Sequence, residues 1–155
     1  MRPMSINTCM AENDFIFVDT NYFVALFNPS DSLHEDAREI SKILAKENKQ
    51  AIISNFIFAE TVTVLAQRRG KDIAFRAGEY LLSHSSRMIH IDEELQIKSW
   101  DIFREVEAKD MSFVDCSILA VMKREGIDTL LTFDKKDFQP LRKQFHFSFY
   151  DESNN

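Results

Sequence analysis

The feature that most constrains this chain is its alternation of short apolar runs with longer segments of helical periodicity. The run Phe15–Val18 is apolar throughout and partly β-branched, which is typical of a strand buried on both faces of a parallel sheet. Similar runs predict strands at 51–54, 88–91 and 129–133, and a fifth at 145–149. We therefore expect an α/β fold, a three-layer α/β/α sandwich around a mainly parallel sheet of about five strands.

The segments between these runs carry apolar residues three and four positions apart, the spacing of amphipathic helices. The first segment places four of them on one face: Leu33, Ala37, Ile40 and Leu44. Gly70, after the basic pair at 68–69, and Gly126 are typical helix stops. The predicted helices cover residues 31–48, 55–69, 71–82, 93–107 and 112–125.

Length and composition favour one packed domain. The chain has 155 residues, of which 45% are hydrophobic, and it contains no internal repeat and no Pro/Gly-rich linker. We divide it into a short N-terminal leader (1–14), a single domain (15–150) and a C-terminal tail (151–155).

Charge and cysteine content exclude several classes of protein. A net charge of −6 argues against a generally basic surface for nucleic acid, while a locally basic rim is compatible with it. The two cysteines show neither metal-ligand nor disulfide-framework spacing, which fits a reducing compartment. No apolar run approaches the roughly 20 residues of a membrane span, so we expect a cytoplasmic protein without a membrane partner.

Acidic residues follow the predicted strands at the points where a ligand site is expected. Asp19 comes directly after the first strand and Asp134 directly after the fourth. The carboxyl ends of parallel strands meet at one edge of the sheet, where such folds bind their ligands. Asp115 stands in the first turn of the helix that Ser112 is placed to cap, so we expect it near the same edge.

Glu60 is the most informative acid because its helical neighbours are largely apolar: Phe56, Ile57, Thr63 and Val64. An ionised carboxylate in such a stripe must be protonated or meet a cation. No Lys or Arg lies four positions from Glu60, Asp19 or Asp115, which favours a metal ion as the partner. Oxygen ligands select hard ions, so we predict Mg²⁺ or Mn²⁺.

Each acid also has a purely structural interpretation. Asp115 can complete a capping box with Ser112, Asp134 can cap the turn after it, and Asp19 can serve a turn. Glu60 can be a partly exposed helix acid or pair with a distant Arg. The joint pattern nevertheless favours a metal site, with Thr20, Asn21 and Ser112 as polar groups that orient the ligands.

Four short motifs carry these acids: Phe17–Asn21 (FVDTN), Phe58–Thr61 (FAET), Ser112–Ser117 (SFVDCS) and Leu131–Phe138 (LTFDKKDF). Their order resembles that of the PIN-domain family, and within it the toxin-like ribonucleases called VapC. The resemblance spans nearly the whole chain.

This resemblance implies a PIN-like fold and an Mg²⁺- or Mn²⁺-dependent endoribonuclease that cleaves RNA phosphodiester bonds with a metal-activated water. It implies that four residues are the catalytic and metal-coordinating acids: Asp19, Glu60, Asp115 and Asp134. Two lysines lengthen the last motif, which makes Asp137 an alternative fourth acid. We prefer Asp134 because it stands at the strand end.

The resemblance further implies an RNA substrate, an antitoxin protein as partner and a homodimer. Three basic residues are candidate RNA contacts: Lys135, Lys136 and Arg68. Three aromatic residues are candidates for a dimer or partner surface: Tyr22, Phe23 and Phe27. Two other functions stay open, a housekeeping RNA-processing nuclease without an antitoxin and a catalytically silent PIN-fold binding module.

Overall fold

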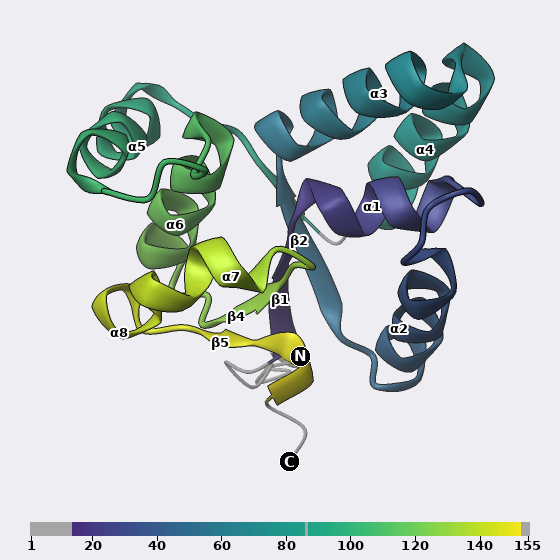
Figure 1. Ribbon diagram of the computed structural model, residues 1–155. Helices are drawn as coiled ribbons and strands as arrows, with labels where there is room; N and C mark the ends of the chain where they lie inside the picture. The colour runs from purple at the N-terminus through teal and green to yellow at the C-terminus, as the bar shows by residue number, and fades with distance from the viewer. Residues whose placement is uncertain (1–13, 86, 153–155) are drawn as a thin grey trace, which may run out of the picture.

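The structure is a computed structural model that describes residues 14–85 and 87–152 (Figure 1). Residues 1–13 of the predicted leader and 153–155 of the predicted tail lie outside the described residues. The start of that tail, Asp151 and Glu152, belongs to a short 3-10 helix, η3 (Tyr150–Glu152).

The sheet has five parallel strands in the order β3-β2-β1-β4-β5, which confirms the predicted fold class. The strands are β1 (Phe15–Val18), β2 (Gln50–Ser54), β3 (Arg87–Ile89), β4 (Thr129–Leu131) and β5 (Ser148–Phe149). β1 is the central strand. All neighbouring strands of the sheet run parallel to one another, so the carboxyl ends of β1, β2 and β4 lie at the same edge.

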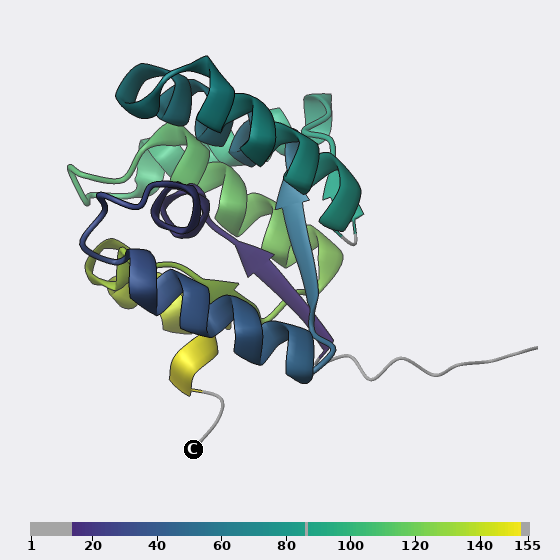
Figure 2. The same ribbon diagram turned by 90° about the vertical axis from the view of Figure 1, so that its right-hand side faces the viewer.

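Helices cover both faces of the sheet and complete the three layers (Figures 1 and 2). One layer holds α1 (Thr20–Phe27), α2 (His34–Lys46), α3 (Asn55–Arg69) and α4 (Lys71–His84). The other holds α5 (Glu93–Glu105), α6 (Phe113–Glu125) and the short elements α7 (Lys135–Phe138), η2 (Gln139–Leu141) and α8 (Arg142–Phe145). No helix in the described ranges is long and apolar enough to cross a membrane.

Helix α1 is the longest element that the sequence did not predict. It begins immediately after β1 because the Asp19 side chain accepts a hydrogen bond from the Thr20 backbone and caps it. The prediction that Tyr22 and Phe23 form a partner surface is wrong, since both are only 3% exposed within the core. An eight-residue helix packed against a sheet must bury one apolar face, and these rings supply it.

Three predicted strands are shorter in the structure, and one of them, predicted at 88–91, is β3 at 87–89. β4 ends at Leu131, and its predicted last residues Thr132 and Phe133 form the connection that leads to Asp134. At the C-terminus, Phe145 closes α8 and only Ser148 and Phe149 form β5. Apolar residues continue past β4 and β5 because the connections are themselves packed against the core.

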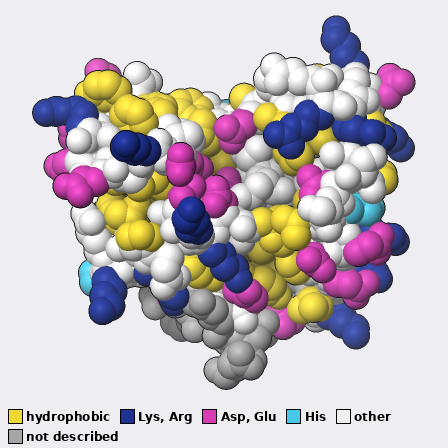
Figure 3. Space-filling view, in the orientation of Figure 1, with side chains coloured by type: hydrophobic (Ala, Val, Ile, Leu, Met, Phe, Trp, Pro, Cys, Tyr) yellow, Lys and Arg dark blue, Asp and Glu magenta, His cyan; other side chains and the backbone are white. Residues whose placement is uncertain are grey.

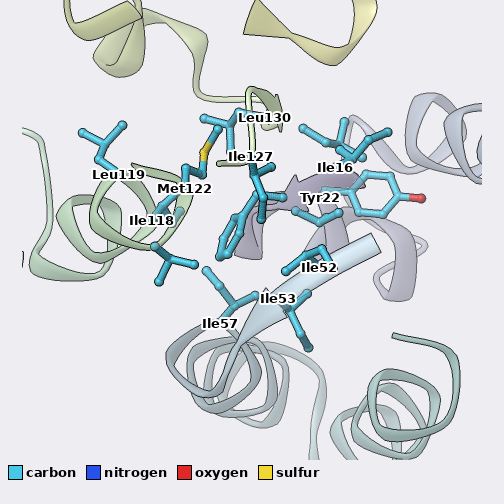
Figure 4. Packing of buried hydrophobic residues seen from close by; sticks show 14 of the residues in the cluster. Ile16, Tyr22, Ile52, Ile53, Ile57, Ile118, Leu119, Met122, Ile127 and Leu130 are labelled. Carbon is cyan, nitrogen blue, oxygen red and sulfur yellow. The ribbon is translucent and has the colours of Figure 1, made fainter. Parts of the chain in front are cut away.

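The core lies between the central strands and helix α6. Phe17 and Val18 of β1 are completely buried, and Ile52 and Ile53 of β2 belong to the same buried cluster as Ile118 of α6 (Figure 4). The ladder continues one residue past β1, since the Asp19 backbone N–H donates to the Leu131 carbonyl at 3.0 Å. The first acid of the predicted site is therefore fixed by the most buried part of the fold.

Candidate active site

The four predicted acids line one hollow of about 350 Å³ at the carboxyl edge of the sheet. They reach it from four separate elements: Asp19 after β1, Glu60 on α3, Asp115 on α6 and Asp134 before α7. Figure 3 shows acidic side chains on both sides of the hollow between the two helical layers. The predicted polar groups line it too, namely Thr20, Asn21 and Ser112.

Asp19 is the most deeply placed of these acids and only 4% exposed. Its Oδ1 accepts from the Thr20 backbone N–H at 2.7 Å and its Oδ2 accepts from the Thr132 hydroxyl at 2.8 Å. Burial, together with the Asp115 and Glu60 carboxylates, raises the pKa of Asp19 to about 7, against the effect of the two hydrogen bonds, which lower it. A cation in the hollow would favour the charged form.

Thr132 is a structural partner of the site that the sequence analysis missed. Besides donating to Asp19, its hydroxyl accepts from Asn21 Nδ2 and from the Asp134 backbone N–H, each at 3.0 Å. Its one donor and two acceptor positions are therefore all used. Asn21 Oδ1 in turn accepts from the Phe133 backbone at 3.0 Å, which ties α1 to the loop after β4. A polar residue interrupting an apolar run beside Asp134 was the available signal.

Glu60 is held by α1 and not by a basic residue. Its Oε2 accepts a 2.5 Å hydrogen bond from the Thr20 hydroxyl, and its side chain is partly buried. Among residues 14–85 and 87–152, neither Lys nor Arg forms an ion pair with Glu60. The alternative of a distant arginine partner therefore has no support in the structure.

Asp115 serves both the helix and the hollow. Its Oδ2 accepts from the Ser112 backbone at 2.8 Å, while its own N–H donates to the Ser112 hydroxyl at 3.0 Å, which is a complete capping box. Burial raises its pKa, and the nearby Asp137 carboxylate adds to that effect. The capping interpretation is correct, and it also aims the carboxylate at the neighbouring acids.

Asp134 lines the hollow, whereas Asp137 is not part of the lining but lies close enough to interact with both Asp134 and Asp115. Asp134 stands at the N-cap position of α7 without making a side-chain capping bond. Partial burial raises the pKa of Asp134, and the Asp137 and Asp115 carboxylates raise it further. The preference for Asp134 as the fourth acid stays a prediction that this placement favours.

The three predicted RNA contacts lie in different surroundings. Arg68 lines the hollow together with the acids. Lys135 instead pairs with Asp151 and lies over the Phe149 ring, 5.7 Å from its centre. Lys136 is exposed beside Asp134 but is not part of the lining.

The donor set fits a hard divalent cation. Every candidate ligand is a carboxylate, and burial, followed by repulsion from nearby carboxylates, raises the pKa values of Asp19, Asp115 and Asp134. Within the described ranges, no three acidic, His or Cys side chains are close enough to ligate one ion directly. An ion here would use few carboxylates together with water, which is the manner typical of Mg²⁺.

A parallel sheet with carboxylates converging at its carboxyl edge defines an α/β protein with an acidic site where such folds bind their ligands. The chain belongs to the PIN-domain family, whose model matches residues 16–143. The predicted family is confirmed.

The similar proteins are VapC-type toxins. The chain is 33% identical over 119 residues to the 23S rRNA-specific endonuclease VapC20 of Mycobacterium tuberculosis, covering 77% of this chain and 88% of that protein. The crystal structure of VapC20, described as a sarcin-ricin loop cleaving toxin, matches with a TM-score of 0.72 at 30% identity, over 81% and 94% of the two chains. The predicted enzyme class, a VapC-like endoribonuclease, is confirmed at this level.

A more distant structure shares the fold. VapBC2 of Rickettsia felis, bound to a promoter DNA fragment, matches with a TM-score of 0.62 at 21% identity, over 81% of this chain and 92% of that one.

Proposed function

We propose that this chain is a divalent-metal-dependent endoribonuclease that acts as the toxin of a toxin–antitoxin pair. The observation that carries the proposal is the convergence of Asp19, Glu60, Asp115 and Asp134 on one hollow. These residues are far apart in the sequence, and although Asp19 and Asp115 also cap helices α1 and α6, capping does not explain why four carboxylates meet at one place. Four negative charges that converge in this way repel one another, and a bound Mg²⁺ or Mn²⁺ would neutralise them.

In this proposal some of the four carboxylates bind the ion directly and the others act through its water ligands, while the polar groups around them keep the carboxylates in place. The ion, when bound, would supply Lewis-acid stabilisation of the phosphoryl group and a more acidic water for attack. Thr132 and the Thr20 backbone orient Asp19, and the Thr20 hydroxyl orients Glu60. No side chain is needed as a covalent nucleophile.

We extend the proposal to ribosomal RNA as the substrate class. The supporting observation is the similarity to VapC20, which is named for cleavage of 23S rRNA and covers most of this chain. An antitoxin that binds this chain and a homodimeric assembly complete the proposal.

The test is cleavage of purified ribosomal RNA by the full chain with Mg²⁺, with Mn²⁺ and with EDTA. We expect discrete cleavage that needs the metal and falls at least 100-fold in Asp19→Asn and Glu60→Gln. Glu39→Gln is the matched control, because Glu39 is exposed on α2 and pairs with Lys42. Metal-independent cleavage, or full activity in both site variants, would refute the mechanism.

Growth on expression separates the remaining functions. A toxin arrests growth, and a co-expressed small partner relieves the arrest. Cleavage without arrest indicates a housekeeping nuclease, and absence of both cleavage and arrest indicates a silent binding module.

A further inference from the structure

Arg68 lines the same hollow as the acids, although a metal site formed by carboxylates has no need of an arginine. In the described part of the chain it is the single Lys or Arg among the residues that line the hollow. The other lining residues include five carboxylates: Asp19, Asp31, Glu60, Asp115 and Asp134. A polyanion such as RNA would be repelled by this lining without a positive charge at its rim.

Helix α3 sets the distance between Arg68 and the acids. Glu60, Val64 and Arg68 are spaced by four residues, and all three line the hollow, so they form one stripe on the helix. Eight residues of α-helix correspond to about 12 Å along the axis. This separation of the two backbone positions favours a neighbouring phosphate group, and not the one held at the acids, as the partner of Arg68.

The Arg68 side chain is free to bind an anion. Residues in a helix lean toward its N-terminus, which directs Arg68 back over the turn of Val64 and toward the hollow. The side chain is exposed, and no carboxylate of the described residues lies within ion-pairing distance of its guanidinium. A planar guanidinium suits bidentate binding of phosphate oxygens.

We propose that Arg68 binds a backbone phosphate of the RNA beside the scissile one, and so sets the path of the strand across the hollow. This inference rests on the proposed ribonuclease function. The contact is to phosphate and carries no sequence information. It fixes the register of the strand relative to the acids, which makes Arg68 a positioning residue for the reaction.

Arg69 provides a matched control on the same helix. Arg69 is also exposed and its substitution changes the net charge equally, but it does not line the hollow and its Nη1 donates to Ser30 Oγ. Comparison of Arg68→Gln with Arg69→Gln therefore separates a local phosphate contact from general electrostatic attraction. Both side chains are exposed at the end of α3, so both variants should keep the thermal stability of the wild type.

The experiment measures ribosomal RNA cleavage by the full chain, and binding of a short fluorescein-labelled RNA in the Asp19→Asn background. We expect Arg68→Gln to raise both KM and the Kd of the RNA at least fivefold, with kcat changed less than twofold. The slope of log Kd against log salt should fall by about 0.7, the value for one lost contact to a single strand. Arg68→Lys should keep that slope with an intermediate KM, because lysine keeps the charge and loses the bidentate geometry.

Two results would overturn the inference while leaving the proposed function intact. The first is equal KM and salt slope in Arg68→Gln and Arg69→Gln. The second is a fall in kcat at unchanged KM in Arg68→Gln, which would place Arg68 at the reacting phosphate. Absence of cleavage by the wild type would refute the proposed function itself, and with it this inference.

Discussion

The Thr132 hydroxyl donates a hydrogen bond of 2.8 Å to Oδ2 of Asp19, joining two residues 113 positions apart. Both lie at the carboxyl edge of adjacent strands, and both are almost completely buried. The bond stabilises a carboxylate that burial would otherwise keep protonated. It therefore links the geometry of the sheet to the charge of the candidate active site.

The first prediction concerns this bond. Thr132→Val keeps the shape of the side chain and removes its donor, so the pKa of Asp19 should rise above its wild-type value. We expect cleavage at pH 7 to fall about tenfold and the pH profile of kcat/KM to move to higher pH. The bond's loss should lower the free energy of unfolding by about 1–3 kcal/mol.

Thr129→Val is the control for Thr132→Val. Thr129 lies on the same strand, and its hydroxyl donates only to the adjacent Asp128 at 3.0 Å. Its activity and pH profile should stay at wild-type values. An unshifted pH profile in Thr132→Val would contradict the role given to this hydroxyl.

The second prediction is that Asp19 destabilises the metal-free fold. Its pKa is raised from 3.8 to about 7, so the folded state binds more protons than the unfolded state between these values. The contribution of Asp19 to stability therefore falls as pH rises from about 4 to about 7. The penalty above pH 7 is of the order of a few kcal/mol, since one unit corresponds to about 1.4 kcal/mol.

Denaturant unfolding in EDTA measures this penalty. Asp19→Asn should be more stable than the wild type at pH 8 and lose that advantage near pH 4, while it loses cleavage activity. Equal stabilities of the two proteins at pH 8 would show that the buried carboxylate carries no such penalty.

The sequence was sufficient for the sheet but not for the first helix. Apolar runs predicted all five strands, because parallel strands buried on both faces need continuous apolar residues. Helix α1 was missed because its apolar residues, such as Tyr22 and Phe23, follow the apolar run of β1 so closely that they give no separate helical pattern. Periodicity over eight residues cannot separate a short buried helix from a loop.

The site was predictable where a residue sits beside a strand end or on an apolar helix face. Asp19 and Glu60 were found by these two signals, and the structure places both at the hollow. Thr132 was missed because its importance depends on a partner more than a hundred residues away. The ion pair of Lys135 could not be predicted from the sequence either, since its partner Asp151 becomes a neighbour only when β5 pairs with β4 in the sheet.

The third prediction concerns metal binding. Mg²⁺ or Mn²⁺ must displace the proton that Asp19 holds up to about pH 7, so the ion should raise Tm more at pH 8 than at pH 6. We expect this shift to disappear in Asp19→Asn and to persist in Glu39→Gln. A shift of equal size at both pH values would argue against Asp19 as a ligand.

The fourth prediction tests how Glu60 is oriented. Thr20→Val removes the hydroxyl that donates to Glu60 Oε2, and a bond to a charged group is worth about 1.5–3 kcal/mol. We expect cleavage to fall three- to tenfold and the metal concentration for half-maximal rate to rise. Thr20→Ser keeps the hydroxyl donor and should retain most of the wild-type cleavage activity. If Thr20→Ser loses as much activity as Thr20→Val, packing of the Thr20 methyl group, and not the hydrogen bond, is what matters.

The last prediction decides between the two candidates for the fourth acid. Asp134 lines the hollow, while Asp137 lies outside the lining and raises the pKa of Asp134 and of Asp115. Asp134→Asn should therefore reduce kcat at least tenfold and weaken the metal-dependent rise in Tm. Asp137→Asn removes a like charge, which lowers the pKa of Asp134, and should change kcat less than threefold. The reverse order of the two losses would make Asp137 the metal ligand and Asp134 its neighbour.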